Sequence, residues 1–101
     1  MMKEKTILVT GAAGFIGSNL CLKLFEKNEN VHIIGIDNMN TYYDVNIKKW
    51  RLSEIERVAE KASENGSKWD FIEGNIADKN CINKLFATYK PDLVVNLAAQ
   101  A

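Results

Sequence analysis

Short apolar runs alternate along the chain with longer segments in which apolar residues recur at helical spacing. The apolar runs lie at about 6–10, 31–36, 69–73 and 93–97, and a helical pattern follows each of the first three. Runs that are apolar almost throughout are typical of strands covered on both faces, and their alternation with helices favours a parallel sheet. With right-handed crossovers, the pattern predicts an α/β fold with about four strands in the order 3-2-1-4 and helices on both faces.

Each of the three helical patterns has an apolar stripe and is bounded by residues that end helices. The stripe positions are Ile16, Leu20, Leu24 and Phe25, then Leu52, Ile55, Ala59 and Ala62, and finally Ile82, Leu85, Phe86 and Tyr89. The first pattern fails at 28–30, Asn65-Gly66 ends the second, and Lys90-Pro91 ends the third, for which Asp78 is the expected N-cap. The mixed charges of the second helix predict a solvated face.

Composition and charge are those of an ordinary globular chain with one domain. The 101 residues are 47% hydrophobic and 26% charged, and the formal net charge is zero. A balanced charge gives no electrostatic reason to expect nucleic acid or an anionic membrane as a partner. No apolar stretch approaches the ~20 residues that cross a bilayer, and no secretory signal follows Met1. Cys21 and Cys81 follow no metal-ligand spacing, so we expect buried thiols and a cytoplasmic location.

The end of the first apolar run carries the candidate chemistry. Gly11, Gly14 and Gly17 follow the strand at intervals of three residues and lead directly into the first helical pattern. This spacing differs from the G-x-G-x-x-G of the common dinucleotide fingerprint, but its position between strand and helix is the same. We expect Gly11 to make the tight turn, Gly14 to let phosphates approach the backbone, and Gly17 to let the helix lie close to the first strand.

A helix start of this kind suits a diphosphate. The first amide N–H groups of a helix have no partner within it, and the peptide dipoles add partial positive charge there. The backbone of Ala13, Phe15 and Ile16, together with the glycines, is therefore predicted to bind the diphosphate of a dinucleotide. The alternative is that the glycines serve only the turn and its packing.

Asp37 closes the second apolar run, twenty residues beyond Gly17. In a dinucleotide site, a carboxylate at this position accepts hydrogen bonds from the adenosine ribose and repels a 2′-phosphate, which favours NAD over NADP. Asn38 is a candidate for a supplementary ribose contact. The alternatives are a turn-forming Asp and an ordinary loop Asn.

Two further segments follow the ends of later strands. Asn75 and Ile76 follow the third strand, where Ile76 would pack on an adenine ring and Asn75 would meet its exocyclic amine; a plain turn before the Asp78 cap is the alternative. Small residues end the fourth strand, where Leu97, Ala98 and Ala99 would let a ligand approach closely. Simple close packing is the alternative there.

No catalytic residue is predicted within the chain. His32 stands at a strand start with no apparent nucleophile or metal partner, which favours a structural role. No lysine lies four residues beyond any tyrosine, and no paired carboxylates or metal-ligand cluster is apparent. The pattern indicates a cofactor site without a reaction centre.

The segments Thr10–Gly17, Asp37-Asn38 and Leu97–Ala101 together resemble the extended short-chain dehydrogenase/reductase family, which includes nucleotide-sugar epimerases and dehydratases. The stretch Asp37–Val45 and the final N-L-A-A-Q-A are most similar to its UDP-glucuronate 4-epimerase branch. One departure is Asn75, which stands where the family usually has an aspartate. The resemblance implies that 1–101 is the N-terminal part of an NAD-binding Rossmann domain.

The same resemblance implies a function for the intact protein. The family's catalytic Ser/Thr, its Tyr-x-x-x-Lys and its sugar-nucleotide domain would lie beyond Ala101, so this chain alone is expected to be inactive. The intact enzyme would epimerise a UDP-sugar through a transient 4-keto sugar, with NAD as cofactor, and would be a homodimer. A nucleotide-sugar 4,6-dehydratase and a non-catalytic NAD-binding module are the alternatives. We also expect the chain alone to self-associate, because its last strand has an unpaired edge.

Overall fold

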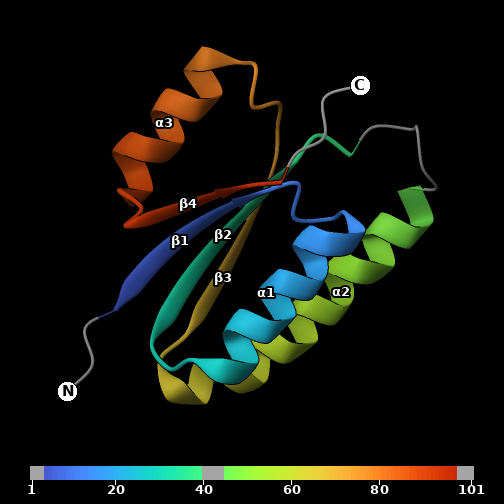
Figure 1. Cartoon of the computed structure of the whole chain (residues 1–101), viewed down its shortest axis with the longest axis vertical. Helices are drawn as coiled ribbons and strands as arrows, with labels where there is room; N and C mark the ends of the chain where they lie inside the picture. Colours follow the sequence, from blue (N-terminus) through green and yellow to red (C-terminus); the bar gives the residue numbers. More distant parts are fainter. Residues whose placement is uncertain (1–3, 40–44, 98–101) are drawn as a thin grey trace.

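A computed structural model describes residues 4–39 and 45–97. All its strands run parallel and form one sheet in the order β3-β2-β1-β4 (Figure 1). The strands are β1 (Lys5–Thr10), β2 (Val31–Asp37), β3 (Lys68–Glu73) and β4 (Leu93–Asn96). The predicted strand order is confirmed, and each predicted strand end lies within one residue of the observed one.

The helices cover both faces of the sheet, as predicted. In Figure 1, α1 (Phe15–Lys27) and α2 (Val45–Ala62) lie side by side on one face, and α3 (Lys79–Tyr89) lies on the other. A short 3-10 turn, η1 (Ser63–Asn65), extends α2 as far as Gly66, whose φ of 81° is left-handed. The side chain of Asp78 accepts hydrogen bonds from the amides of Asn80 and Cys81, which confirms the predicted N-cap of α3.

Alternate side chains of the two central strands form two cores. Ile7, Val9 and Ile33 pack with Phe25 of α1 and Ile55 of α2 on one face. On the other face, the α3 side, the buried core residues are Leu8, Ile34, Ile36 and Leu85. Because β1 and β2 are buried on both faces, they read in the sequence as continuous apolar runs. The predicted stripe of α2 is confirmed, since Ile55, Ala59 and Ala62 are buried and Leu52 packs against them.

Three burial predictions are wrong. Phe86, predicted in the apolar stripe of the third helix, is 42% exposed, because α3 buries Leu85 and packs Ile82 and Tyr89 against the core instead. Ile16 is 67% exposed, because α1 contacts the neighbouring turn through Gly17 and buries Cys21 and Phe25. Ile16, which precedes Gly17 on the helix, therefore points away from the core. Cys81 is only half-buried, whereas Cys21 is fully buried. No helix among the described residues is long and apolar enough to cross a membrane.

Candidate functional site

The glycine turn between β1 and α1 lies at the carboxyl edge of the sheet. Gly11 has a φ of 72°, a left-handed conformation that favours glycine, so the predicted tight turn is confirmed. The amides of Gly11 and Ala12 both donate to the carbonyl of Ile36, at 2.8 and 3.2 Å, and the amide of Gly14 donates to the carbonyl of Gly11 at 3.0 Å. The first two bonds hold the turn against β2. Together the three bonds occupy the amides of Gly11, Ala12 and Gly14.

Gly17 is required by close packing. A Cβ at this position would lie 2.1 Å from the carbonyl oxygen of Gly11, a distance that real Cβ atoms do not reach. The close approach predicted for Gly17 is therefore present, but it is to the turn rather than to the strand. Gly14 differs, because its φ of −74° suits any residue and a Cβ there would lie 3.2 Å from the same oxygen.

The first turn of α1 presents amide groups without acceptors. The first bond of the helix runs from the amide of Ser18 to the carbonyl of Gly14. For the amides of Phe15, Ile16 and Gly17, no acceptor is found among the described residues. No side chain caps this end and no acidic residue lies in its first turn. The start of α1 therefore has the donors and the dipole to hold an anion, whereas Asp78 already satisfies the start of α3.

Asp37 lies at the end of β2, beside this turn, and is 7% exposed. Its Oδ2 accepts a hydrogen bond from the amide of Ala13 at 3.1 Å, and its Oδ1 accepts one from the amide of Met39 at 2.8 Å. The glycine turn and the acidic residue, which the sequence analysis assigned to one site, are thus in direct contact. An ionised carboxylate has about four acceptor positions, so further contacts determine how much of Asp37 is left for a ligand.

Lys48 of α2 is one of two residues at this site that sequence analysis did not predict. Its ammonium group lies 3.0 Å from Oδ1 of Asp37, and the two side chains are 8% and 5% exposed. Lys48 continues the buried stripe of Leu52 and Ile55 towards the start of α2. A charged residue in line with an apolar stripe was the available signal that this lysine has a buried partner.

Arg51 joins the next turn of α2 to the glycine turn. Its Nη1 donates to the carbonyl of Ala13 at 3.3 Å, and its guanidinium carbon lies 5.8 Å from the centre of the Phe15 ring. Lys48 and Arg51, three residues apart, therefore contact Asp37 and the turn from the same helix. The prediction of a purely solvated charged face on α2 is wrong at these two positions, because both lie where α2 meets the carboxyl edge of the sheet.

The segment after β3 lies at the same edge. The amide of Gly74 donates to the backbone carbonyl of Asp37 at 3.0 Å. Asn75 makes the local turn that was the alternative interpretation, since its Oδ1 accepts from the amide of Ala77 at 2.9 Å. Ile76 is half-buried and packs against the core on the α3 side. The adenine contacts of Asn75 and Ile76 stay predictions, with Asn75 already engaged in the turn.

The remaining predicted residues border the turn or lie outside the described residues. Asn38 is exposed next to Asp37. Leu97 is half-buried, and its amide donates to Oγ1 of Thr10 at 2.9 Å, which ties the end of β4 to the end of β1. Ala98 and Ala99 lie outside the described residues. Helix α1 leads from β1 to β2 on one face of the sheet, and α3 leads from β3 to β4 on the other, so the strand order changes direction between β1 and β4. Open α/β sheets bind ligands at such a point.

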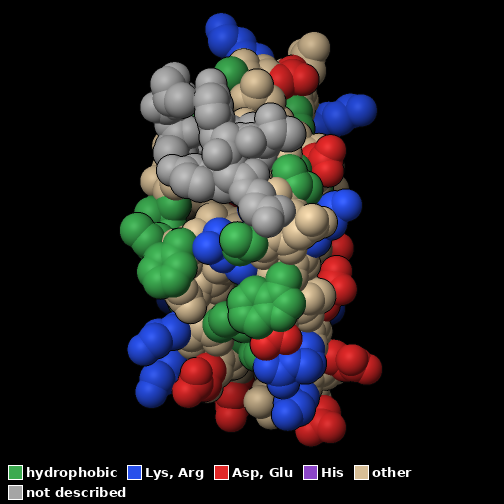
Figure 2. All heavy atoms as spheres, turned by 90° about the vertical axis from the view of Figure 1, so that its right-hand side faces the viewer, with side chains coloured by type: hydrophobic (Ala, Val, Ile, Leu, Met, Phe, Trp, Pro, Cys, Tyr) green, Lys and Arg blue, Asp and Glu red, His purple; other side chains and the backbone are tan. Residues whose placement is uncertain are grey.

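Exposed apolar side chains lie in the first turns of α1 and α2. Phe15 and Ile16 are 69% and 67% exposed, and Ile47 and Trp50 are exposed in the first turns of α2. Figure 2, which faces the right-hand side of Figure 1, shows hydrophobic side chains among Lys and Arg near the middle of this face. Large apolar groups beside unpaired amides favour a ligand with both apolar and anionic parts.

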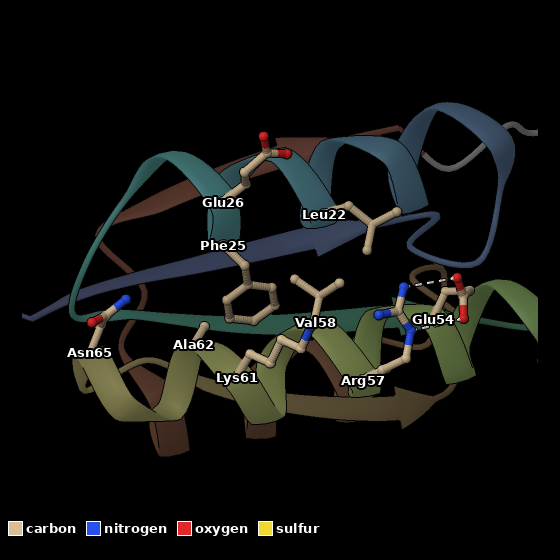
Figure 3. Close-up of a pocket in the computed structure, with 9 residues that line it drawn as sticks. All are labelled: Leu22, Phe25, Glu26, Glu54, Arg57, Val58, Lys61, Ala62 and Asn65. Atoms are coloured by element: carbon tan, nitrogen blue, oxygen red, sulfur yellow. Dashed lines mark hydrogen bonds and ion pairs between the residues drawn. The ribbon is translucent and has the colours of Figure 1, made fainter.

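A groove of about 450 Å³ lies elsewhere, between the C-terminal halves of α1 and α2 (Figure 3). Leu22, Phe25 and Val58 point into it, and the ion pair of Arg57 with Glu54 borders it. None of the predicted site residues lines this groove. Its lining does not include the amides at the start of α1 or the Asp37 carboxylate described above.

No reaction centre is found in the part of the chain that the structure describes, which holds no group of residues suited to a metal ion. His32 has a partner that sequence analysis did not identify, since its Nε2 lies 2.6 Å from Oδ2 of Asp70 across β2 and β3. The Tyr89 ring meets His32 edge-on at 5.6 Å, so this cluster ties α3 to the sheet. Burial raises the pKa of the Cys21 thiol to about 12, which leaves that thiol unreactive.

The strand order, the glycine turn and the acidic residue at the end of β2 together define a dinucleotide-binding α/β fold of the Rossmann type. Residues 8–101 match the family described as GDP-mannose 4,6 dehydratase, and the chain belongs to that family.

Relatives in this group include both epimerases and dehydratases. UDP-glucuronate 4-epimerase 4 of Arabidopsis thaliana is 40% identical over 96 residues, 95% of this chain and 20% of that protein. The crystal structure of UDP-glucuronic acid 4-epimerase from Bacillus cereus, in complex with UDP-glucuronic acid and NAD, is 33% identical with a TM-score of 0.72 over 93% of this chain and 26% of that one. The crystal structure of dTDP-glucose 4,6-dehydratase from Bacillus anthracis, in complex with NAD, is 27% identical with a TM-score of 0.74. The match covers 95% of this chain and 27% of that one.

The chain spans between 20% and 28% of the length of the curated relatives it matches. The resemblance to NAD-dependent epimerases and dehydratases stated from sequence is thus confirmed for an N-terminal segment of such proteins.

Proposed function

We propose that this chain binds NAD at the carboxyl edge of its sheet. The observation that carries the proposal is the start of α1, where three successive amides lack an acceptor among the described residues. The Asp37 carboxylate accepts a hydrogen bond from Ala13 in the turn that leads into this helix. Diphosphate and ribose are the chemical groups that fit these two features. The relatives crystallised with NAD support the same ligand.

Each part of the dinucleotide has proposed contacts. The amides of Phe15, Ile16 and Gly17 hold the diphosphate, Gly14 leaves room for it, and Gly11 and Ala13 shape the turn. Asp37 and Asn38 bind the adenosine ribose, Asn75 and Ile76 border the adenine, and Leu97, Ala98 and Ala99 form a wall beside the nicotinamide. When bound, NAD supplies hydride acceptance and return; the protein supplies orientation and electrostatics.

Asp37 retains limited capacity for the ribose. Three donors already contact its two oxygens, namely the amides of Ala13 and Met39 and the ammonium group of Lys48. About one acceptor position is left, so we propose that Asp37 accepts one ribose hydroxyl. A negative charge at this place still disfavours a 2′-phosphate, and the adjacent ammonium group weakens that preference.

For the intact protein we propose a nucleotide-sugar 4-epimerase that acts on UDP-glucuronate through a transient 4-keto sugar. Relatives named UDP-glucuronate 4-epimerase support it. A 4,6-dehydratase is the second candidate, favoured by the family description and by the dTDP-glucose 4,6-dehydratase structure. A non-catalytic NAD-binding module is the third. This chain alone is proposed to be inactive, because no tyrosine in it has a lysine four residues further along.

Two experiments test these proposals. Calorimetric titration of the chain with NAD and with NADP is expected to give saturable binding that favours NAD; no binding of either would contradict the site. Incubation of the intact protein with UDP-glucuronate and with GDP-mannose separates the activities. A 4,6-dehydratase expels the 6-hydroxyl, which glucuronate lacks, so conversion of UDP-glucuronate into its C4 epimer identifies an epimerase, and water loss from GDP-mannose identifies a dehydratase.

A further inference from the structure

We propose that Arg51 of α2 is a positioning residue that sets the geometry of the diphosphate site without touching the diphosphate. This inference rests on the proposed dinucleotide binding at the start of α1. It assigns a role to a residue outside the glycine turn and outside the predicted site. Its basis is the pair of contacts that Arg51 makes on either side of Gly14.

The first contact fixes one peptide unit. The carbonyl of Ala13 accepts a hydrogen bond from Nη1 of Arg51 at 3.3 Å, and the amide of the same peptide unit, that of Gly14, donates to Gly11 at 3.0 Å. The Ala13–Gly14 peptide plane is therefore bonded at both ends. Gly14 is the N-cap residue, so this plane directs the chain into the first turn of α1.

The second contact lies on the other side of Gly14. The guanidinium group of Arg51 lies 5.8 Å from the centre of the Phe15 ring, within the range of a cation–π interaction. Phe15 carries the first of the three amides without acceptors, and its ring is otherwise largely exposed. Because Phe15 is 69% exposed, few contacts with the core restrict its side chain, so Arg51 supplies an orientation that the core does not.

The planar guanidinium group suits this double role. One edge donates to a carbonyl while the face or the remaining edge meets an aromatic ring, which an ammonium group on a flexible stem does not reproduce. Lys48 holds Asp37 from the preceding turn of α2, so the two basic residues act on different parts of the site. Loss of Arg51 is therefore expected to weaken binding of the diphosphate and to leave the ribose contact of Asp37 in place.

The test compares Arg51→Met with Arg57→Met in the whole chain. Arg57 is on the same helix, is exposed, and pairs only with Glu54 among the described residues, so it is a matched control. Binding of ADP and of adenosine is measured by titration at low and at high salt. The ADP-to-adenosine affinity ratio within one variant does not depend on its folded fraction, so partial unfolding does not obscure the result.

We expect Arg51→Met to weaken ADP binding about fivefold at both salt concentrations, the equivalent of ~1 kcal/mol, with adenosine binding changed less than about twofold. Arg57→Met is expected to leave the affinities for ADP and for adenosine unchanged. Arg51→Lys is expected to weaken ADP binding nearly as much as Arg51→Met does. In the free variant, faster amide hydrogen exchange at Gly14 is expected as well, because its bond to Gly11 loosens.

Other outcomes overturn the inference. Equal weakening of ADP and adenosine, or no weakening, contradicts a role specific to the diphosphate. A loss that disappears at high salt, with affinity kept in Arg51→Lys, indicates direct charge contact instead of positioning. If the unmodified chain binds neither ADP nor NAD, the proposed function fails with it, a result distinct from failure of the Arg51 variant alone.

Discussion

Lys48 Nζ lies 3.0 Å from Oδ1 of Asp37, in an ion pair that is buried between α2 and the end of β2. The same carboxylate accepts a hydrogen bond from Ala13 in the glycine turn. Three segments of the chain that are separate in sequence therefore meet at one side chain. The residue proposed to bind the ribose is also a structural connection, and its two roles need separate tests.

The first prediction concerns the stability of this ion pair. Lys48→Met leaves a buried carboxylate with only its amide donors, and Asp37→Leu leaves a buried ammonium group without its partner. Each single change is expected to lower the free energy of unfolding by ~3 kcal/mol, since breaking a buried pair strands the other charge. Denaturant unfolding of both variants measures this.

The double variant provides the control. Because it removes both charges, its destabilisation should be at least ~1 kcal/mol smaller than the sum of the two single changes. Additive effects would mean that the two side chains do not interact in solution.

The second prediction concerns the choice between NAD and NADP. In Lys48→Met, the charge of Asp37 is no longer balanced by an ammonium group, so repulsion of a 2′-phosphate increases. The ratio of NAD to NADP affinity is therefore expected to rise several-fold, measured by calorimetry on the folded variant. Lys49→Met, at the exposed neighbouring position, is the matched control and should leave the ratio unchanged. A ratio that stays the same or falls in Lys48→Met would contradict the proposed position of the 2′-hydroxyl beside Asp37 and Lys48.

The third prediction separates two glycines that look equivalent in sequence. Gly17→Ala places a Cβ 2.1 Å from the carbonyl of Gly11, so α1 has to move and the chain is expected to lose several kcal/mol of stability. Gly14→Ala meets the same oxygen at 3.2 Å with an ordinary φ, so its fold is expected to persist. Thermal unfolding distinguishes the two. Gly14→Ala should instead weaken NAD binding, because its methyl group would take up space that the diphosphate is proposed to use. Unchanged NAD affinity would count against the proposed diphosphate position.

Much of this fold was predictable because its signals are local. The strands β1 and β2 are buried on both faces and are apolar almost throughout, and Asp78 caps α3 through its own neighbouring amides. The glycine turn and Asp37 were predicted to share a site because both end adjacent parallel strands. Such features depend on spacing along the chain and on the rule that parallel strands share a carboxyl edge.

The contacts of Lys48, Arg51 and His32 were not predictable in the same way. Each depends on how a helix or a neighbouring strand is placed in three dimensions, and a lysine or arginine on a charged helix looks solvated in sequence. The exposure of Ile16 has a similar cause. The close contact of Gly17 with Gly11 sets which side of α1 faces the core, and Ile16 lies on the other side. The spacing of apolar residues along the helix does not predict this contact.

The fourth prediction uses the two thiols. Burial raises the pKa of Cys21 from an ordinary value of 9.0 to about 12, so the folded state disfavours the thiolate. The free energy of unfolding is therefore unaffected by this group below pH 9.0 and falls as the pH rises from 9.0 towards about 12, by ~1.4 kcal/mol per pH unit. Cys21→Ala should flatten the pH dependence of denaturant unfolding over this range. An identical slope in the variant would contradict the assignment.

Alkylation provides a second readout of the same burial. Half-buried Cys81 is expected to react with an alkylating reagent well before fully buried Cys21 in the folded chain. Cys81→Ser removes the faster reaction and serves as the control. Equal rates for the two thiols would indicate that the α1 core opens readily.

The amide resonances of Phe15, Ile16 and Gly17 during titration with NAD provide the most direct measurement. We expect the resonances of these three amides to shift with one saturation curve, together with that of Asp37, while the capped amides of Asn80 and Cys81 at the start of α3 stay unchanged. Saturable NAD binding that leaves Phe15, Ile16 and Gly17 unshifted, with the largest changes at another surface such as the groove between α1 and α2, would contradict it.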